Sequence, residues 1–448
     1  MLQALTPAGL LLATAAVVTV CFAASLFAAS PTVGVSALAA GQAWQVVTRG
    51  QVPVLDAGIS LYPLDILAVC AALAAAISLV RRPVKAHLGH AALAVLALLV
   101  SVSLLTGMEA YGFQPAGNEA RVYFLHVLAV VSYIATVGRG ASLERTMLVT
   151  WIVLACVYSV TAVYWWSRLG IGSNSDYAVI DGSRVNARPI DAASAFVVAE
   201  AAVMLLCRPR RGPGGRTMIV FLLLVVVLLQ HRTVWIAALV MLSGWLVLRP
   251  GPPERKVLGV GAALLAAVTM GLAALLFEND GLTRHLASSA TNEDTWQWRV
   301  DSWRLLVDKL SGFHDWLFGQ PFGSGFARFL YTGVVDVQPH NYYLHLVLRV
   351  GVVGLCAALV LVITMLRRTD RRTPEGLTLW LATAGIACFC LTYALPFEQS
   401  LLIGLLLRQP AASRGAPRGR RHRTAEDHHA HRIHRADLTC SAEGPSRL

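Results

Sequence analysis

Apolar stretches of roughly membrane-spanning length follow one another along almost the whole chain. A helix that crosses the hydrocarbon core of a bilayer needs about 20 mostly apolar residues. The composition agrees, since only 14% of the residues are charged, against ~25% in soluble domains. The sequence therefore predicts an all-α polytopic membrane protein with about 11–12 transmembrane helices. The stretches that meet or approach the required length are residues 8–29, 60–80, 87–106, 122–138, 146–166, 191–207, 217–231, 233–248, 256–278, 341–366, 375–394 and 398–408.

The basic residues between these stretches predict the orientation of the helices. Cytoplasmic loops of membrane proteins are enriched in Lys and Arg. With the N-terminus inside, five inner loops carry sixteen basic residues and the short outer loops carry six. No Lys or Arg precedes the first apolar stretch, so we interpret it as a span and not as a signal peptide. The pattern predicts a cytoplasmic (inner) membrane protein with a cytoplasmic N-terminus. The net charge of +12 is then mainly a topology signal and does not indicate a nucleic-acid partner.

Residues 1–407 are expected to form one transmembrane bundle that includes a large extracytoplasmic loop, 279–340. An ordered loop of this length is uncommon unless it forms a lid or a binding site. Part of it repeats apolar residues at helical spacing, which predicts an amphipathic helix on the bundle or the headgroup layer. These residues are Trp296, Val300, Trp303, Leu306 and Leu310.

The last residues, 408–448, are rich in Arg, His, Ala and Pro and show no hydrophobic periodicity. This composition predicts a disordered, basic cytoplasmic tail. A frameshifted gene end would give the same composition.

Several arginines are expected on the outer side, against the usual bias. Arg184 and Arg188 precede one span, Arg232 lies at the tip of a helical hairpin, and Arg299 lies in the large loop. Guanidinium groups that face one compartment suit a phosphate or diphosphate, because each can donate two hydrogen bonds.

His340 and Asn341 stand at the start of the span that follows the large loop. Imidazole is the usual proton-transfer group near neutral pH. The alternative is an Asn that caps the helix beside an interfacial His. The cysteines, including Cys388 and Cys390, do not have the number and spacing of metal ligands. We therefore expect no metal and no cofactor.

Three stretches together resemble the O-antigen ligase and O-antigen polymerase family. Residues 338–355, Gln-Pro-His-Asn-Tyr-Tyr-Leu-His-Leu-Val-Leu-Arg-Val-Gly-Val-Val-Gly-Leu, are similar to its His-Asn-x-x-Leu…Gly-x-x-Gly-Leu signature. Residues 230–235 resemble its Ser-Arg-x-x-Trp hairpin. Arg299…Trp303 followed by Phe-Gly-Ser-Gly-Phe at 322–326 is similar to its outer-loop pattern. The order and sidedness of these motifs fit from about Leu61 to Gly404.

The resemblance implies a metal-independent C-type glycosyltransferase of surface polysaccharide biosynthesis. Such an enzyme takes a saccharide from an undecaprenyl-diphosphate carrier and passes it to a glycan, lipid or protein acceptor outside the cytoplasmic membrane. Carried onto this chain, Arg232 and one of Arg184 or Arg188 would hold the diphosphate. Arg299 would help to hold the diphosphate or would position the large loop. His340 would act as the base for the acceptor hydroxyl or orient it, and Asn341 would contact substrate.

The chain departs from the family at two positions. Family members usually carry Glu where this chain has Arg349, which lies ~13 Å into its span by helical rise. Glu200 is expected at a similar depth, so we expect a Glu200–Arg349 pair, because an unpaired charge there costs at least a few kcal/mol. The residue before Arg232 is commonly Ser in the family and is His231 here, which leaves open a second titrating group.

Three alternatives remain open from the sequence. Polymerase and ligase are not distinguished by these motifs. A transporter of polysaccharide or lipid-linked sugar would also be polytopic, although transporters tend to show internal repeats, and none is apparent here. An inactive family member would explain both Arg349 and the unusual tail.

Overall fold

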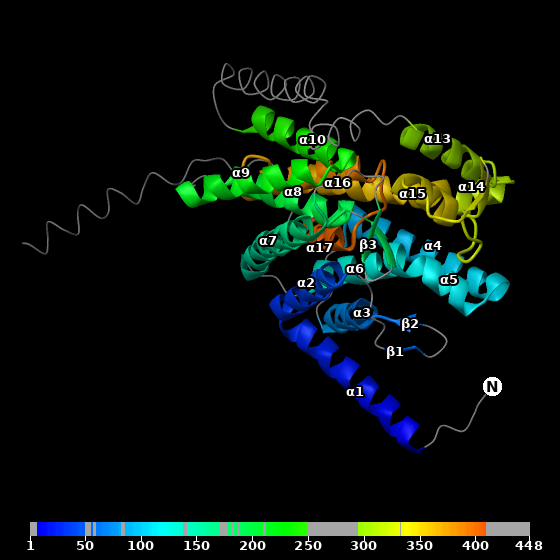
Figure 1. Ribbon diagram of the computed structural model, residues 1–448. Coiled ribbons are helices and arrows are strands. Elements are labelled where there is room, and N and C mark those ends of the chain that lie inside the picture. The colour runs from blue at the N-terminus through cyan, green and yellow to red at the C-terminus, as the bar shows by residue number, and fades with distance from the viewer. Residues whose placement is uncertain are drawn as a thin grey trace, which may run out of the picture. The chain divides into compact units, whose positions relative to one another are not determined.

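A computed structural model describes residues 7–49, 55–56, 60–81, 86–137, 141–170, 177–180, 183–186, 188–208, 212–249, 294–331 and 333–408. The predicted span 256–278, the first part of the outer loop and the tail after residue 408 lie outside the described residues. Within the described ranges the chain is largely helical, and its β-structure consists of two-stranded hairpins (Figure 1). The predicted all-α polytopic class is confirmed.

The helices of the first half are α1 (Pro7–Ala29), α2 (Pro31–Val47), α3 (Pro63–Arg81), α4 (Leu88–Tyr111), α5 (Phe113–Ala120), a π-helical turn (Arg121–Leu125), α6 (His126–Thr136) and α7 (Ala141–Leu169). Those that follow are α8 (Ala192–Cys207), α9 (Pro213–Leu228), α10 (Arg232–Leu248), α13 (Asp294–Val307), α14 (Phe313–Phe318), α15 (Tyr342–Arg368), α16 (Pro374–Phe389) and α17 (Phe397–Arg408). The antiparallel pairs are β1 (Leu55–Asp56) with β2 (Ser60–Leu61), β3 (Tyr177–Ile180) with β4 (Ser183–Asn186), and β5 (Arg328–Leu330) with β6 (Gly333–Val335).

Five described helices have the length and hydropathy of membrane spans. They are Pro63–Arg81, Leu88–Tyr111, Phe113–Thr136, Leu143–Leu169 and Tyr342–Arg368. The third of them joins α5, the π-helical turn and α6 into one element. Shorter apolar helices, among them α8, α9 and α10, complete the described bundle.

The helix α17 is much shorter than a membrane span and yet deeply buried. Its 12 residues rise about 18 Å, against a hydrocarbon core of ~30 Å. All residues from Phe397 to Leu407 are buried, and the helix packs against α6. Because neighbouring helices cover it, its ends do not expose backbone groups to lipid.

The helix α2 occupies a region that the sequence analysis assigned to an outer loop. It begins with Pro31, which suits the first turn of a helix, and buries Val35 and Leu38. Its Gln42 and Gln45 interrupt the apolar residues, so the sequence did not reveal it as a helix of the bundle. Two helices therefore precede α3 where one was predicted. Because α2 is not among the described helices with the length and hydropathy of a span, the cytoplasmic N-terminus stays a prediction.

The predicted hairpin between residues 217 and 248 is confirmed. The chain turns at Gln230, whose φ of 57° is positive, between the end of α9 and the start of α10. The indole Nε1 of Trp235 donates to the carbonyl of Val226 at 3.0 Å and ties the two helices together.

The described part of the outer loop contains α13, α14 and the β5–β6 hairpin. The predicted amphipathic helix 296–310 corresponds to α13, which ends earlier, at Val307. Leu306 and Leu310 pack with Phe326 and Leu348 in a small apolar cluster that joins the loop to α15.

Gly351 interrupts α15 with a non-helical conformation (φ 67°, ψ −173°). The break leaves the carbonyl of Leu348 without its usual helical donor, and the N–H of Gln320 donates to it at 2.7 Å. A Cβ at Gly351 would lie 2.0 Å from the carbonyl oxygen of Leu317. The end of α14 therefore packs directly against the backbone of α15 at this break.

Arg349, which is 1% exposed, binds the outer loop and α5. Its guanidinium forms a salt bridge with Glu119 and donates to the carbonyl of Gly325 at 2.8 Å. Glu119 also accepts from the N–H of Gly323 at 2.8 Å. One ion pair thus links α5, α15 and the Gly-Ser-Gly segment of the loop.

The predicted Glu200–Arg349 pair is wrong. Glu200 accepts from the indole of Trp151 at 3.0 Å and from the amide of Gln399 at 2.6 Å, whereas Arg349 is paired with Glu119. Helical rise gives the depth of a residue in a span but not its neighbours, and the nearer carboxylate comes from α5.

We expect Gly351→Ala to lower the thermal unfolding temperature of the purified protein in detergent. The added methyl group would clash with α14, and the left-handed backbone adds strain on the order of 1–3 kcal/mol. Gly117→Ala in α5 is the matched control, because a Cβ there meets nothing within 4 Å. An unchanged unfolding temperature for Gly351→Ala would contradict the seating of α14.

We expect Glu119→Gln to destabilise the protein by about 3–5 kcal/mol, because it leaves the buried charge of Arg349 uncompensated. Limited proteolysis should also cut the outer loop faster. Glu109→Gln, at an exposed position of α4, serves as the control. Equal unfolding temperatures and cleavage rates for Glu119→Gln and wild type would show that the pair does not anchor the loop.

Candidate functional site

The hairpin tip places His231 and Arg232 at the start of α10. His231 is 2% exposed, and its Nε2 donates to the carbonyl of Ile190 at 3.1 Å. Its Nδ1 then lies 3.4 Å from Nη1 of Arg188 and can accept from it. The segment before α8 is thereby fixed to the hairpin, and Arg188 is held next to Arg232.

His231 does not add positive charge to the site at neutral pH. Burial, reinforced by the charge of Arg188, lowers the pKa of His231 to about 3. The neutral ring orients Arg188, which answers the question of a second titrating group raised by the sequence.

Arg49 holds the same segment from the other side. Its Nη2 donates to the carbonyl of Arg188 at 2.8 Å, and its guanidinium lies 3.8 Å from the ring centroid of Trp165. Arg49 therefore positions the backbone that carries Arg188.

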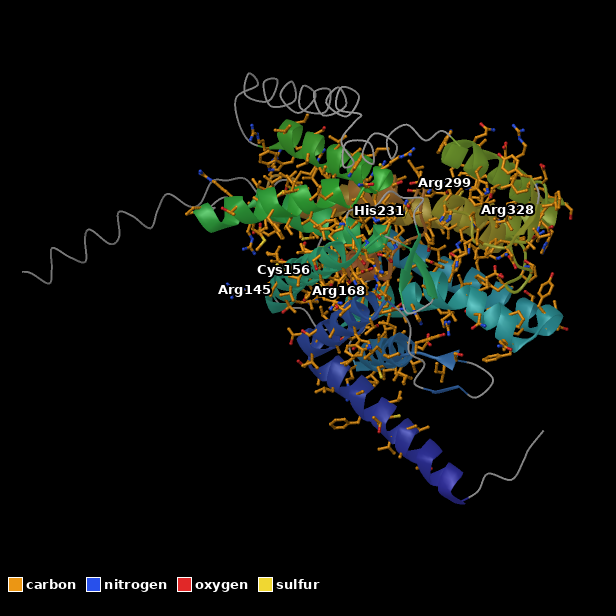
Figure 2. All side chains as sticks on the ribbon, in the orientation of Figure 1. Arg145, Cys156, Arg168, His231, Arg299 and Arg328 are labelled. Atoms are coloured by element: carbon orange, nitrogen blue, oxygen red, sulfur yellow. The ribbon has the colours of Figure 1, made fainter. Side chains whose placement is uncertain are left out.

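Arg299 and His340 meet at Tyr393, in the connection between α16 and α17. The guanidinium of Arg299 lies 5.4 Å from the Tyr393 ring centroid, and the His340 ring lies 5.9 Å from it. The indole of Trp298 lies 6.4 Å from His340 on another side. In the view of Figure 2, Arg299 lies between His231 and Arg328.

His340 is also neutral at physiological pH. Burial, followed by the charges of Arg299 and Arg328, lowers the pKa of its imidazole to about 4. A neutral imidazole can accept a proton or a hydrogen bond from a hydroxyl group.

Three of the predicted arginines share one electrostatic environment. Burial, followed by the charges of Arg299 and Arg188, lowers the pKa of Arg232, so the charges of the three guanidinium groups act on one another. The Nε of Arg299 is buried and has no hydrogen-bond acceptor among the described residues. An anion with several oxygens would relieve this repulsion and accept that N–H.

Arg184 and Asn341 are the two remaining predicted residues. Arg184 belongs to β4, where its backbone pairs with Val179, and its side chain lies outside the described residues. Asn341 is the N-cap of α15, and its side chain accepts from the N–H of Leu344 at 3.0 Å. Its observed contact is the capping bond that the sequence analysis weighed as an alternative.

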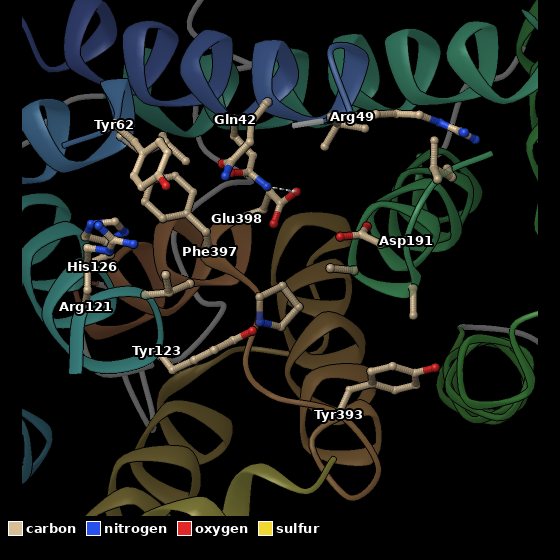
Figure 3. Close-up of a pocket in the computed structure, with 18 of the residues that line it drawn as sticks. Gln42, Arg49, Tyr62, Arg121, Tyr123, His126, Asp191, Tyr393, Phe397 and Glu398 are labelled. Carbon is tan, nitrogen blue, oxygen red and sulfur yellow. Dashed lines mark hydrogen bonds between the residues drawn. The ribbon is translucent and has the colours of Figure 1, made fainter. Parts of the chain in front are cut away.

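A cavity of about 670 Å³ adjoins this cluster. Arg188 and His231 are among the residues that line it. Figure 3 shows Glu398 between Tyr393 on one side and Arg121, His126 and Tyr62 on the other. The structure therefore brings Arg188, Arg232, Arg299 and His340 together beside a cavity.

Sequence reasoning missed Tyr393, Arg49 and the cavity. Tyr393 carried a weak signal, since it lies at the end of the predicted span 375–394, where aromatic residues are common, whereas Arg49 follows α2, which was not predicted. The cavity depends on α2, which was not predicted, so the residues that line it could not be predicted from the sequence.

Residues 217–359 match a family model described as O-antigen ligase. None of the curated proteins compared with the chain matches it. The matched segment contains Arg232, Arg299, His340 and Arg349, and the match supports the resemblance of this part of the chain to the O-antigen ligase/polymerase family.

Proposed function

We propose that this chain transfers a saccharide from an undecaprenyl-diphosphate carrier to a glycan, lipid or protein acceptor outside the cytoplasmic membrane, in surface polysaccharide biosynthesis. The family match supports an O-antigen ligase-type membrane glycosyltransferase in general. The observation that carries the finer proposal is the grouping of Arg188, Arg232 and Arg299 beside the neutral His340.

The arginines are assigned to the diphosphate. As the glycosidic bond breaks, negative charge grows on the leaving diphosphate, and guanidinium groups held in place stabilise that charge without reorganising. In this proposal arginines supply the charge that a metal ion supplies in other transferases, so the enzyme is of the metal-independent C type.

His340 is assigned to the acceptor. Its lowered pKa keeps the imidazole unprotonated, so it can take the proton of the acceptor hydroxyl or orient that hydroxyl. Tyr393 lies against both Arg299 and His340, and we assign it the role of setting the spacing between the donor and acceptor sides.

The site is proposed to face the extracytoplasmic side of the inner membrane. From α3 onward, the basic loops lie at the ends of the helices remote from the hairpin tip and from His340. The positive-inside bias then places those loops, and the tail after residue 408, in the cytoplasm.

We expect deletion of the gene to change the surface glycan, and His340→Ala not to restore it. Loss of a general base typically costs 10²–10⁴-fold in rate. In the deletion strain, single repeats in place of long chains would indicate a polymerase, and long chains left on the carrier would indicate a ligase. Gel analysis of surface and lipid-linked glycan is the measurement.

His314→Ala is the matched control, because the side chain of His314, in the same loop, is 80% exposed. It should restore the wild-type glycan. Full complementation by His340→Ala would remove His340 from the mechanism. A deletion without any change in glycan would overturn the enzymatic proposal in favour of a transporter or an inactive member.

We expect kcat/KM of the purified enzyme to stay nearly constant as the pH falls from 8 to 5 and to drop only near the His340 pKa of about 4. Arg299→Gln removes a charge that disfavours the imidazolium, so its acid limb should move up toward the ordinary value of 6.5. Arg299→Gln should also lower kcat/KM at every pH, because Arg299 is assigned to the diphosphate, so the result that would contradict this coupling is an acid limb that stays near pH 4.

A further inference from the structure

The cavity has a second polar end that the proposed chemistry does not use. Asp65, His126 and Arg121 line this end, opposite Tyr393 (Figure 3). Asp65 receives the N–H of Tyr62 at 2.7 Å, the His126 Nε2 at 2.8 Å and Arg121 at 3.5 Å. This wall is held rigidly, in part by the π-helical turn Arg121–Leu125, a local distortion often found at functional sites.

Glu398 lies between the two ends and is 1% exposed. Its Oε1 accepts from the hydroxyl of Tyr158 at 2.9 Å and from the amide of Gln42 at 3.2 Å. Its Oε2 is buried and has no partner among the described residues, although the residue lines the cavity. Leaving a buried polar group unsatisfied is costly, so this oxygen calls for a ligand that can hydrogen-bond to it.

The lining of the cavity suits a saccharide. Carboxyl and amide groups pair with hydroxyls, and the lining also includes the aromatic residues Tyr62 and Phe397, which suit the apolar part of a sugar ring. The volume of about 670 Å³ lies within the roughly 300–1,000 Å³ that is usual for small-ligand sites.

We propose that this cavity binds the carrier-linked saccharide and that Glu398 is a specificity-determining residue, which pairs through Oε2 with one of its hydroxyls. The inference rests on the proposed function, because it extends the diphosphate site. Arg188 lines the same cavity, so a sugar attached to a diphosphate held by Arg188 would enter it. This continuity favours the donor saccharide over the acceptor.

The test compares two lipids on the purified full-length protein in nanodiscs. One is undecaprenyl diphosphate, and the other is the lipid-linked saccharide that accumulates in the deletion strain. We expect Glu398→Gln to bind the lipid-linked saccharide roughly 10–100-fold more weakly than wild type does and undecaprenyl diphosphate equally well. Arg299→Gln should weaken the binding of both lipids.

Glu200→Gln is the matched control. Glu200 is equally buried, and one of its oxygens accepts two hydrogen bonds while the other has no partner among the described residues. It does not line this cavity, so its variant should bind both lipids as wild type does. The side-chain amide oxygen that Glu398→Gln introduces can still accept from Tyr158 and Gln42, and an unchanged unfolding temperature would verify that the fold is kept.

Three results would overturn the inference. Equal weakening of both lipids by Glu398→Gln would mean that Glu398 acts on the diphosphate or the fold and not on the saccharide. Unchanged donor binding with a raised KM for the acceptor would assign the cavity to the acceptor. If wild type bound neither lipid, the proposed function itself would fail, and the inference with it.

Discussion

Burying a guanidinium group within a membrane bundle costs several kcal/mol unless an opposite charge meets it, and in this chain the side chains around Arg349 satisfy that requirement. Glu119 neutralises the charge, while Gly325 accepts a second hydrogen bond. Because Glu119 also accepts a hydrogen bond from the N–H of Gly323, the ion pair that neutralises Arg349 also fixes the outer loop to α5 and α15. The same loop carries Arg299 and leads to His340, so the geometry of the candidate site depends on this ion pair.

The site keeps its positive charge on arginine and its histidines neutral. Burial and crowded guanidinium groups hold the pKa of His340 and of His231 well below the usual range. The division gives two chemical functions within one small volume, a cationic surface for an anionic group and an uncharged base beside it. If both histidines were protonated, the repulsion within the cluster would rise and no base would remain. In the proposed mechanism the arginines therefore prepare the acceptor side of the site as well as the donor side.

The sequence was sufficient for the features that follow from local pattern. Apolar stretches gave the membrane class, and the polar tip at Gln230 gave the α9–α10 hairpin. The motifs around Arg232, Arg299 and His340 named residues that the structure brings together. What failed depended on tertiary contacts. α2 is too polar to be recognised as a helix of the bundle, and the partner of Arg349 comes from α5, far away in sequence. Asn341 caps a helix, which sequence could offer only as one of two possibilities, and the cavity exists only where α2, α3, α6 and α17 meet.

The burial of α17 has a consequence for how the protein reaches the membrane. A segment of a dozen residues is too short to partition into a bilayer by its own hydrophobicity, and this one also carries Glu398 and Gln399. Its place is created by α6 and the other helices around it, all of which are made earlier in synthesis. The segment must therefore be drawn in by contacts with helices that precede it in the chain. The cavity, which Phe397 and Glu398 line, is then complete only after α17 has packed against those helices.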